Sequence, residues 1–294
     1  MKRLLILSGK GGTGKTTTAA AFTRFAQAQA IADCDVDAPN LHIVSNLKGE
    51  PEHTDFLGGD KALIDTNKCI GCGLCMQHCR FDSIKKNGTV FEIDAYACEG
   101  CGVCAYVCPQ KAITMLQDVA GEQSLYQGDT VFSTAKLKMG RGNSGKLVTA
   151  VKLSMLQHAL DCELAIIDGS PGIGCPVIAS VSGMDLVLVV AEPSLSGISD
   201  LQRLVKTTNT FQTKIAVCVN KWDTSPENAM AIETYCKENN IPFVGKIPYD
   251  KHASVAINAG KSIADIDCPA RNALKQIFEK TSELLDIHIE TKKE

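Results

Sequence analysis

Residues 4–22 read LLILSGKGGTGKTTTAAAF, and this stretch decides the fold. Within it, residues 9–16 fit the pattern G-x-x-x-x-G-K-[ST] of a phosphate-binding loop. The apolar run at residues 4–7 predicts a short buried strand, and the threonines and alanines after the loop predict the start of a helix. Because strand, glycine loop and helix is the context in which this pattern binds phosphate, a chance glycine-rich turn is the weaker interpretation.

The glycines of this loop let the backbone curl so that its N–H groups point inward at a phosphate. The helix N-terminus adds partial positive charge behind them. The motif predicts that Lys15 reaches the β- and γ-phosphates and that the Thr16 hydroxyl holds Mg²⁺. The residues expected to contact the nucleotide here are Gly11, Gly12, Thr13, Gly14, Lys15, Thr16 and Thr17.

Lys10 is a second lysine in the same loop, and it would repel Lys15 unless extra negative charge needs neutralising. The stretch KGGTGKT at residues 10–16 resembles the deviant loop of the MinD/ParA/nitrogenase-iron-protein class. In that class the first lysine reaches across a dimer to the partner's nucleotide, much as an arginine finger does. The resemblance therefore implies a nucleotide-dependent homodimer with Lys10 and Lys15 as catalytic residues. A solvated lysine in a monomeric loop is the alternative.

Alternating carboxylates at Asp33, Asp35 and Asp37 follow a short apolar run, and we expect the strand to end near Asp33. In the resembling class this loop is the first switch, and the residue at the position of Asp35 orients the attacking water or a Mg²⁺-bound water. The roles of Asp33 and Asp37 are left open. A polar loop with Asx-turns is the alternative for this segment.

Residues 163–172 read ELAIIDGSPG and predict a buried strand that delivers Asp168 to the carboxyl edge of a sheet. There Asp168 can bind Mg²⁺ through water, and Gly172 can offer its N–H to the γ-phosphate as part of a second switch. Cys175 follows this segment. In the nitrogenase iron protein a cysteine near this place ligates a shared cluster, but the spacing here differs, so we expect a small buried thiol.

Residues 220–223 read NKWD at the end of another apolar run. Taken alone this is N-K-x-D, in which the aspartate reads the edge of guanine. In the MinD-like class the asparagine at this position faces adenine, so the resemblance favours ATP and assigns Asn220 to the base. GTP is the alternative. A loop containing Pro248 and Tyr249 is expected to close over the base.

Fourteen cysteines are present, and eight of them form two sets with the spacing C-x₂-C-x₂-C-x₃-C. The sets begin at residues 69 and 98, 29 residues apart, and their surroundings repeat at the same distance, as Asp65 and Asp94 illustrate. This is an internal duplication. Its members are Cys69, Cys72, Cys75 and Cys79 in the first set, and Cys98, Cys101, Cys104 and Cys108 in the second.

Three closely spaced cysteines can wrap one face of a [4Fe-4S] cubane, while the fourth points at the other site and ligates the other cluster. The predicted ligand sets are Cys69, Cys72, Cys75 and Cys108 for one cluster, and Cys98, Cys101, Cys104 and Cys79 for the other. The stretch resembles a bacterial two-[4Fe-4S] ferredoxin. It departs from that pattern at Arg80, a cation that could raise the potential of one cluster. Structural zinc is the alternative, although zinc sites generally use two C-x₂-C pairs separated by a longer loop.

Alternating strand and helix patterns predict an α/β fold with a doubly wound, mostly parallel sheet, interrupted by a ferredoxin-like α+β insert. The expected boundaries are residues 1–58 and 118–294 for the nucleotide domain and 59–117 for the insert. We expect residues 117–146 to be polar and irregular. Because the insert is too small for a strong core of its own, its folding should depend on its clusters.

Composition narrows the class of protein further. The chain has 294 residues, 45% of them hydrophobic, and a net charge of −3, which argues against nucleic-acid binding through bulk charge. Without an apolar run of membrane-spanning length or an export signal, we expect a cytoplasmic protein with no stable membrane insertion. In that compartment the cysteines indicate metal rather than disulfides.

The combined motifs predict an Mg²⁺-dependent ATPase with two [4Fe-4S] clusters that dimerises on ATP. Its conformational change would be coupled to electron transfer, or to iron–sulfur and metallocofactor assembly, through an unidentified redox partner or client protein. The main alternative is a MinD-like spatial or cell-division regulator whose clusters are structural or sense redox state. A passive electron carrier with a degenerate ATPase is less favoured, since every phosphate-contacting residue is present.

Overall fold

The computed structural model describes residues 1–159 and 161–287, so the end of the expected 118–294 segment and Leu160 lie outside the described residues. The chain divides into two compact units. The first unit contains residues 1–53, 123–136 and 144–294, and the second contains residues 54–122 and 137–143. No helix in the described ranges has the length and apolar character needed to cross a bilayer.

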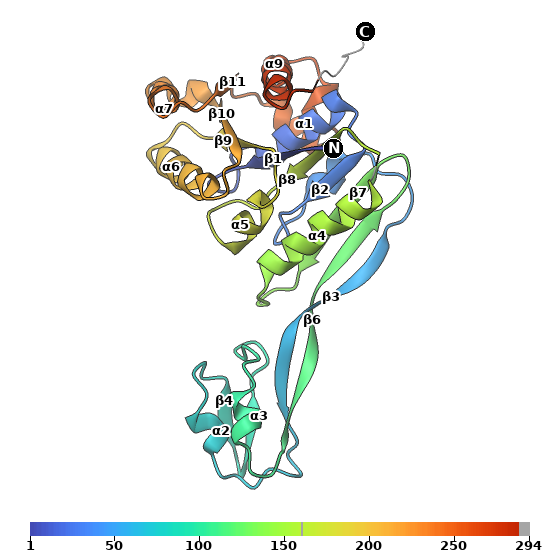
Figure 1. Ribbon diagram of the computed structural model, residues 1–294, viewed down its shortest axis with the longest axis vertical. Helices are drawn as coiled ribbons and strands as arrows, with labels where there is room; N and C mark the ends of the chain where they lie inside the picture. The colour runs from blue at the N-terminus through green and yellow to red at the C-terminus, as the bar shows by residue number, and fades with distance from the viewer. Residues whose placement is uncertain (160, 288–294) are drawn as a thin grey trace. The chain divides into compact units, whose positions relative to one another are not determined.

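A parallel sheet forms the centre of the first unit (Figure 1). Its strands run in the order β11-β10-β9-β1-β8-β2-β7, with β1 paired in parallel to β8 on one side and to β9 on the other. The chain therefore winds outward in both directions from β1, and the loop after β1 lies at a topological switch point, where α/β folds bind ligands. The bounds are β1 Lys2–Leu7, β2 Ala30–Asp33, β7 Val131–Leu137, β8 Leu164–Asp168, β9 Leu186–Ala191, β10 Lys214–Asn220 and β11 Phe243–Ile247.

Helices cover both faces of this sheet. Figure 1 shows α1 and α9 on one face and α4, α5 and α6 on the other. Phe22 of α1 and Phe278 of α9 are buried with ring centroids 5.1 Å apart, which joins the two helices over β8 and β11. The bounds are α1 Lys15–Ala26, α4 Ser144–His158, α5 Cys175–Val181, α6 Leu195–Asn209, α7 Pro226–Glu238, α8 His252–Asn258 and α9 Pro269–Leu284.

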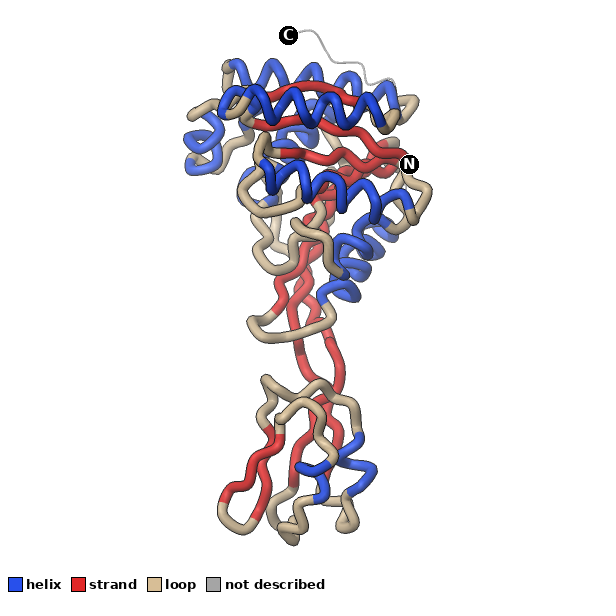
Figure 2. Tube along the Cα trace, turned by 90° about the vertical axis from the view of Figure 1, so that its left-hand side faces the viewer, coloured by secondary structure: helices blue, strands red, loops and turns tan. Residues whose placement is uncertain are grey.

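The second unit repeats one backbone pattern twice. Asp94 donates its N–H to the Ser83 carbonyl at 2.8 Å, and Asp65 donates its N–H to the Ala112 carbonyl at the same distance. These bonds cross between the halves in equivalent places, so the sequence duplication is also a structural one. Figure 2 shows the β4–β5 hairpin and the two short helices of this unit. The bounds are β3 Glu52–Ile64, α2 Leu74–Gln77, β4 Ile84–Asn87, β5 Val90–Ile93, α3 Val103–Val107 and β6 Ile113–Tyr126.

The segment at residues 117–146 is largely regular, so the expectation of an irregular connection was wrong. It contains the end of β6, the whole of β7 and the start of α4, and the sheet order continues from β7 through β6 to β3. Residues 137–143 belong to the second unit. Within that unit Arg141 pairs with Asp118 at 3.1 Å and lies over the Tyr96 ring, which fixes this short return segment.

Lys152 is a buried cation on α4 that holds the C-terminal end of α5. Its Nζ donates to the carbonyls of Ala179, Ser180 and Ser182 at 2.6, 3.0 and 2.6 Å. These carbonyls lie at the helix end, where backbone acceptors lack intrahelical partners and a cation is favourable. The contact therefore fixes α5, which directly follows the predicted second switch.

We expect Lys152→Ala to lower the free energy of unfolding by about 2–4 kcal/mol, because three buried carbonyls lose a charged donor. Urea unfolding followed by circular dichroism would measure the change. Lys146→Ala removes an exposed lysine from the same helix and serves as the control. Equal effects of the two substitutions would contradict a specific role for Lys152.

Candidate nucleotide and cluster sites

The phosphate-binding loop joins β1 to α1 and lines a cavity of about 610 Å³. Gly14 has φ +95°, and a Cβ there would meet the Asn220 side-chain nitrogen at 2.2 Å. Only glycine tolerates both the left-handed backbone and this close approach. The predicted residues that line the cavity are Lys10, Gly11, Gly12, Gly14, Lys15, Thr16, Thr17, Asp35, Asn220, Pro248 and Tyr249.

Lys15 is almost completely buried and pairs with carboxylates from two other segments. Its Nζ lies 2.6 Å from Asp168 Oδ1 and 3.7 Å from Asp35 Oδ2. Burial alone would lower the pKa of Lys15, but these carboxylates outweigh it and hold the pKa above its ordinary value. The ammonium is therefore charged and can exchange a carboxylate for a phosphate.

Asp168 is completely buried, and its second oxygen, Oδ2, has no hydrogen-bond partner among the described residues. A buried carboxylate oxygen without a partner is costly, and a cation or an ordered water would satisfy it. Thr16 lines the nucleotide cavity, and its hydroxyl lies 3.4 Å from Lys15 Nζ, which also contacts Asp168 behind the cavity lining. These oxygen donors suit Mg²⁺, which favours one or two protein ligands together with water and phosphate.

Asp33, whose role the sequence left open, organises the loop that follows β2. Its carboxylate accepts the N–H groups of Asp35, Asn40 and Leu41 at 3.1, 3.0 and 2.9 Å. Burial, with Asp168 nearby, raises the pKa of Asp33 to about 7. Asp33 therefore has a structural role, because its carboxylate fixes the backbone that presents Asp35. Burial also raises the pKa of Asp35, with Lys15 opposing that effect.

The segment after β8, the predicted second switch, is held by a hydrogen bond to the loop that follows β1. Gly172, expected to donate to a γ-phosphate, donates its N–H to the Ser8 carbonyl at 3.0 Å. That bond would have to break before the group could reach a nucleotide. Cys175, at the start of α5, is exposed, so the expectation of a buried thiol was wrong. Its neighbours Ile173 and Ile178 are also exposed at 42% and 44%, which places this turn at the surface.

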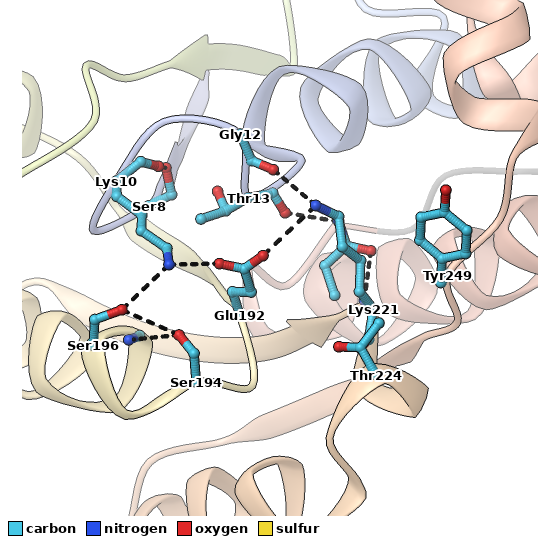
Figure 3. Close-up of polar contacts among 12 residues, drawn as sticks. Ser8, Lys10, Gly12, Thr13, Glu192, Ser194, Ser196, Lys221, Thr224 and Tyr249 are labelled. Carbon is cyan, nitrogen blue, oxygen red and sulfur yellow. Dashed lines mark hydrogen bonds and ion pairs between the residues drawn. The ribbon is translucent and has the colours of Figure 1, made fainter.

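Glu192 lies between Lys10 and Lys221 and contacts both side chains (Figure 3). Lys10 Nζ lies 2.7 Å from Glu192 and 3.3 Å from Ser196 Oγ. Lys221 Nζ lies 3.6 Å from the same carboxylate and donates to the Gly12 carbonyl at 3.1 Å. The hydrogen bond from Lys10 and the nearby positive charges hold the pKa of Glu192 below its ordinary value. Lys10 is therefore bound within its own chain.

Asn220 lines the cavity, but its amide is already engaged. The Nδ2 group donates to the Thr13 carbonyl at 2.7 Å, and Oδ1 accepts the Lys221 N–H at 2.9 Å. These two bonds use one of the two N–H donors and one of the two oxygen lone pairs of the amide, so Asn220 supports the phosphate loop and keeps donor and acceptor capacity toward the cavity that it lines. Asp223 is the residue that would contact guanine if the N-K-x-D pattern applied. Its carboxylate accepts the Tyr249 N–H at 2.7 Å and so anchors the loop that is expected to close over the base.

The cysteines of the second unit gather around two separate cavities. Cavity A is lined by Cys69, Cys72, Cys75 and Cys108, and cavity B by Cys79, Cys98, Cys101 and Cys104. Each cavity thus takes three cysteines from one half and the fourth from the other half. Ile64, Phe91 and Ile113 line cavity A, whereas His78, Ser83 and Glu99 make cavity B more polar. Arg80 is exposed and is not among the residues that line cavity B.

This arrangement can be tested against zinc and against a cubane. No three His, Cys, Asp or Glu side chains of the described residues converge as ligands of one metal ion. A zinc site needs four ligands at about 2.0–2.3 Å from a single ion. A [4Fe-4S] cluster instead takes one thiolate on each of four irons, so its ligands stand around a cavity. Each cavity is lined by four cysteines, the number of thiolates that a [4Fe-4S] cluster requires.

Comparison with known proteins shows the family of the chain. Residues 4–263 match the family model of the CobQ/CobB/MinD/ParA nucleotide binding domain. The chain belongs to this family. Accordingly it is a P-loop ATPase of the MinD/ParA type, and the sequence prediction of that class is confirmed.

The relatives and solved structures agree with this assignment. An uncharacterised protein of Methanocaldococcus jannaschii is 30% identical, covering 96% of this chain and 97% of its own. An iron-sulfur cluster carrier protein of Pyrococcus horikoshii is 25% identical, covering 95% and 84%. The cell division ATPase MinD of Pyrococcus furiosus shares the fold, with a TM-score of 0.57, 16% identity and coverage of 96% and 99%.

Sequence reasoning missed Glu192 and Ser83 as site residues. Glu192 comes next to the predicted machinery only after folding, because β9 pairs with β1 and brings Glu192 to Lys10. For Ser83 a signal existed, because the duplication aligns it with Ala112 and the two residues differ.

Asp223 offers a test of which purine the cavity accepts. We expect Asp223→Ala to weaken ATP binding about fivefold, since the Tyr249 loop loses one hydrogen bond of about 1 kcal/mol, and to weaken GTP binding by no more than the same factor. Titration with fluorescent ATP and GTP analogues would measure both affinities. Asp223→Asn keeps an acceptor oxygen and is the matched control. Tight GTP binding that Asp223→Ala abolishes would contradict the adenine assignment.

Proposed function

We propose that this protein is an ATP-hydrolysing iron–sulfur protein whose nucleotide-driven conformational change is coupled to electron transfer or to iron–sulfur cluster assembly. The observation that carries the proposal is the presence, in one chain, of a MinD/ParA-type nucleotide loop and two cavities each lined by four cysteines. Either feature alone would suit a simpler role. Their combination calls for a function that uses both.

At the nucleotide cavity, Lys15 would leave Asp168 and bind the β- and γ-phosphates. Thr16 and Asp168 would hold Mg²⁺, which neutralises phosphate charge when bound. Asp35, positioned by the backbone that Asp33 fixes, would orient the attacking water. Gly172 would exchange the Ser8 carbonyl for the γ-phosphate, so that the segment after β8 reports whether ATP or ADP is bound.

Lys10 would act across a homodimer, as in the family it resembles. To do so it must first leave Glu192 and Ser196 of its own chain. Glu192 therefore competes with the partner's nucleotide for the same ammonium group. This makes it a restraint on dimer closure in the absence of ATP.

In the second unit, the cysteines of cavities A and B would each hold one [4Fe-4S] cluster, which supplies one-electron transfer when bound. Relatives named iron-sulfur cluster carrier protein support a second possibility, in which a cluster is cargo that the chain delivers to a client protein. A spatial regulator is less supported, because the likeness to cell-division proteins concerns the fold.

The decisive experiment compares ATP binding and hydrolysis by anaerobically purified protein in the oxidised and dithionite-reduced states. We expect about eight irons per chain. Reduction should change ATP affinity by about 5–150-fold, the usual range of coupling between two sites. Lys15→Ala, which should keep its iron and lose ATP binding, is the control. A pull-down with ATP would identify the client.

Two results would contradict this proposal in different ways. Iron far below eight per chain would exclude two cubanes. A fully loaded protein whose ATP affinity and hydrolysis do not respond to reduction would leave both sites in place but remove the coupling between them.

If Glu192 restrains Lys10 in the monomer, removing its charge should favour the ATP-bound dimer. Glu192→Gln should let the ATP-bound dimer form at about two- to fivefold lower protein concentration, the effect of losing a partly exposed ion pair. Light scattering across a concentration series would measure this. In a Lys10→Ala background the same substitution should have no effect, because the restrained group is absent. A weaker dimer in Glu192→Gln would instead place Glu192 in the closed interface.

A further inference from the structure

Ser83 carries a buried hydroxyl beside one of the cavity-lining cysteines. The side chain of Ser83 is 3% exposed, and its Oγ lies 3.2 Å from Cys79 Sγ. Either atom of a free thiol and hydroxyl pair can donate. Once Cys79 is an iron-bound thiolate it has no proton, so the Ser83 hydroxyl must be the donor.

The duplicate half lacks this hydroxyl. The carbonyls of Ser83 and Ala112 accept equivalent N–H groups from Asp94 and Asp65, both at 2.8 Å, so the two residues occupy the same place in the repeat. Ser83 follows Cys79 by four residues, and Ala112 follows Cys108 by four residues. These two cysteines are the ones that line the cavity of the other half. At Cys108 the Ala112 backbone N–H lies 3.3 Å from the sulfur, and the methyl side chain adds no donor.

The extra donor favours negative charge on the sulfur it reaches. At 3.2 Å from Cys79 Sγ, the Ser83 Oγ is close enough to donate to the sulfur. Reducing a [4Fe-4S] cluster places one more negative charge on the same atoms. Hydrogen bonds to cluster sulfurs therefore stabilise the reduced form and raise its potential.

We infer that the Ser83 hydroxyl raises the one-electron reduction potential of the cluster in cavity B relative to its duplicate in cavity A. The inference rests on the proposed function, because it requires both clusters. The step is one electron from an external reductant converting the oxidised cluster from the 2+ to the 1+ state, with no bond made or broken and no proton moved. The two cavities thereby become unequal electron sites despite their common backbone.

The test is a redox titration of the full chain, loaded with both clusters and followed by low-temperature EPR. Ser83→Ala should make reduction of one cluster about tenfold less favourable, which is ~59 mV for one electron, and leave the other unchanged. Ser83→Thr keeps the hydroxyl and should restore the wild-type value. The repeat offers the reciprocal variant: Ala112→Ser should raise the potential of the other cluster.

Several outcomes would overturn the inference. With both clusters retained, unchanged potentials in Ser83→Ala, or equal shifts of both clusters, would exclude a local effect of the hydroxyl. If Ser83→Ala binds less iron, Ala112→Ser decides, and the absence of an upward shift there counts against the inference. A wild-type chain without two clusters would overturn the proposed function as well, whereas unchanged potentials in a loaded protein overturn this inference alone.

Discussion

One buried lysine faces three carboxylates at the carboxyl edge of the sheet, and this excess of negative charge governs the nucleotide site. Lys15 contacts Asp168 and Asp35, while Asp33 lies behind them and is fully buried. Like charges in a medium of low dielectric constant cannot all remain ionised without compensation. Burial, and after it the charge of Asp168, raise the pKa of Asp33 to about 7.

The raised pKa of Asp33 makes the free energy of unfolding depend on pH. Between about pH 4 and pH 7 the folded protein keeps a proton on Asp33 that the unfolded chain releases, so this group adds stability as the pH falls through that range. A divalent cation relieves the same repulsion without a proton. The site is therefore built to gain from Mg²⁺, and the unpartnered Asp168 oxygen marks where compensation is missing.

The sequence predicted the parts whose function depends on local spacing. The phosphate loop, Asp168 at the end of its strand and the two cysteine sets are all short motifs. The phosphate loop lines one cavity, and each cysteine cavity takes three residues from one set and the fourth from the other. β6 was missed because it is half exposed and carries polar residues, so it lacks the apolar alternation of a strand with one buried face. β7 is largely buried but contains Ser133 and Thr134, which break the apolar run expected of a buried strand. Contacts such as Glu192 with Lys10 depend on which strands become neighbours, and spacing along the chain does not encode that.

The two lysines that the proposed chemistry needs, Lys15 and Lys10, are already paired with carboxylates of their own chain, and Lys221 beside them shares one of these carboxylates. Lys15 is paired with Asp168, and Lys10 and Lys221 share Glu192. A triphosphate oxygen competes with these carboxylates for the same ammonium groups. Where a phosphate displaces the carboxylate, a different segment loses its contact: the end of β8 at Lys15, and the start of α6 at Lys10. Because these segments lie on different elements, such displacement alters several contacts together, which is what a site whose occupancy is sensed elsewhere in the chain requires.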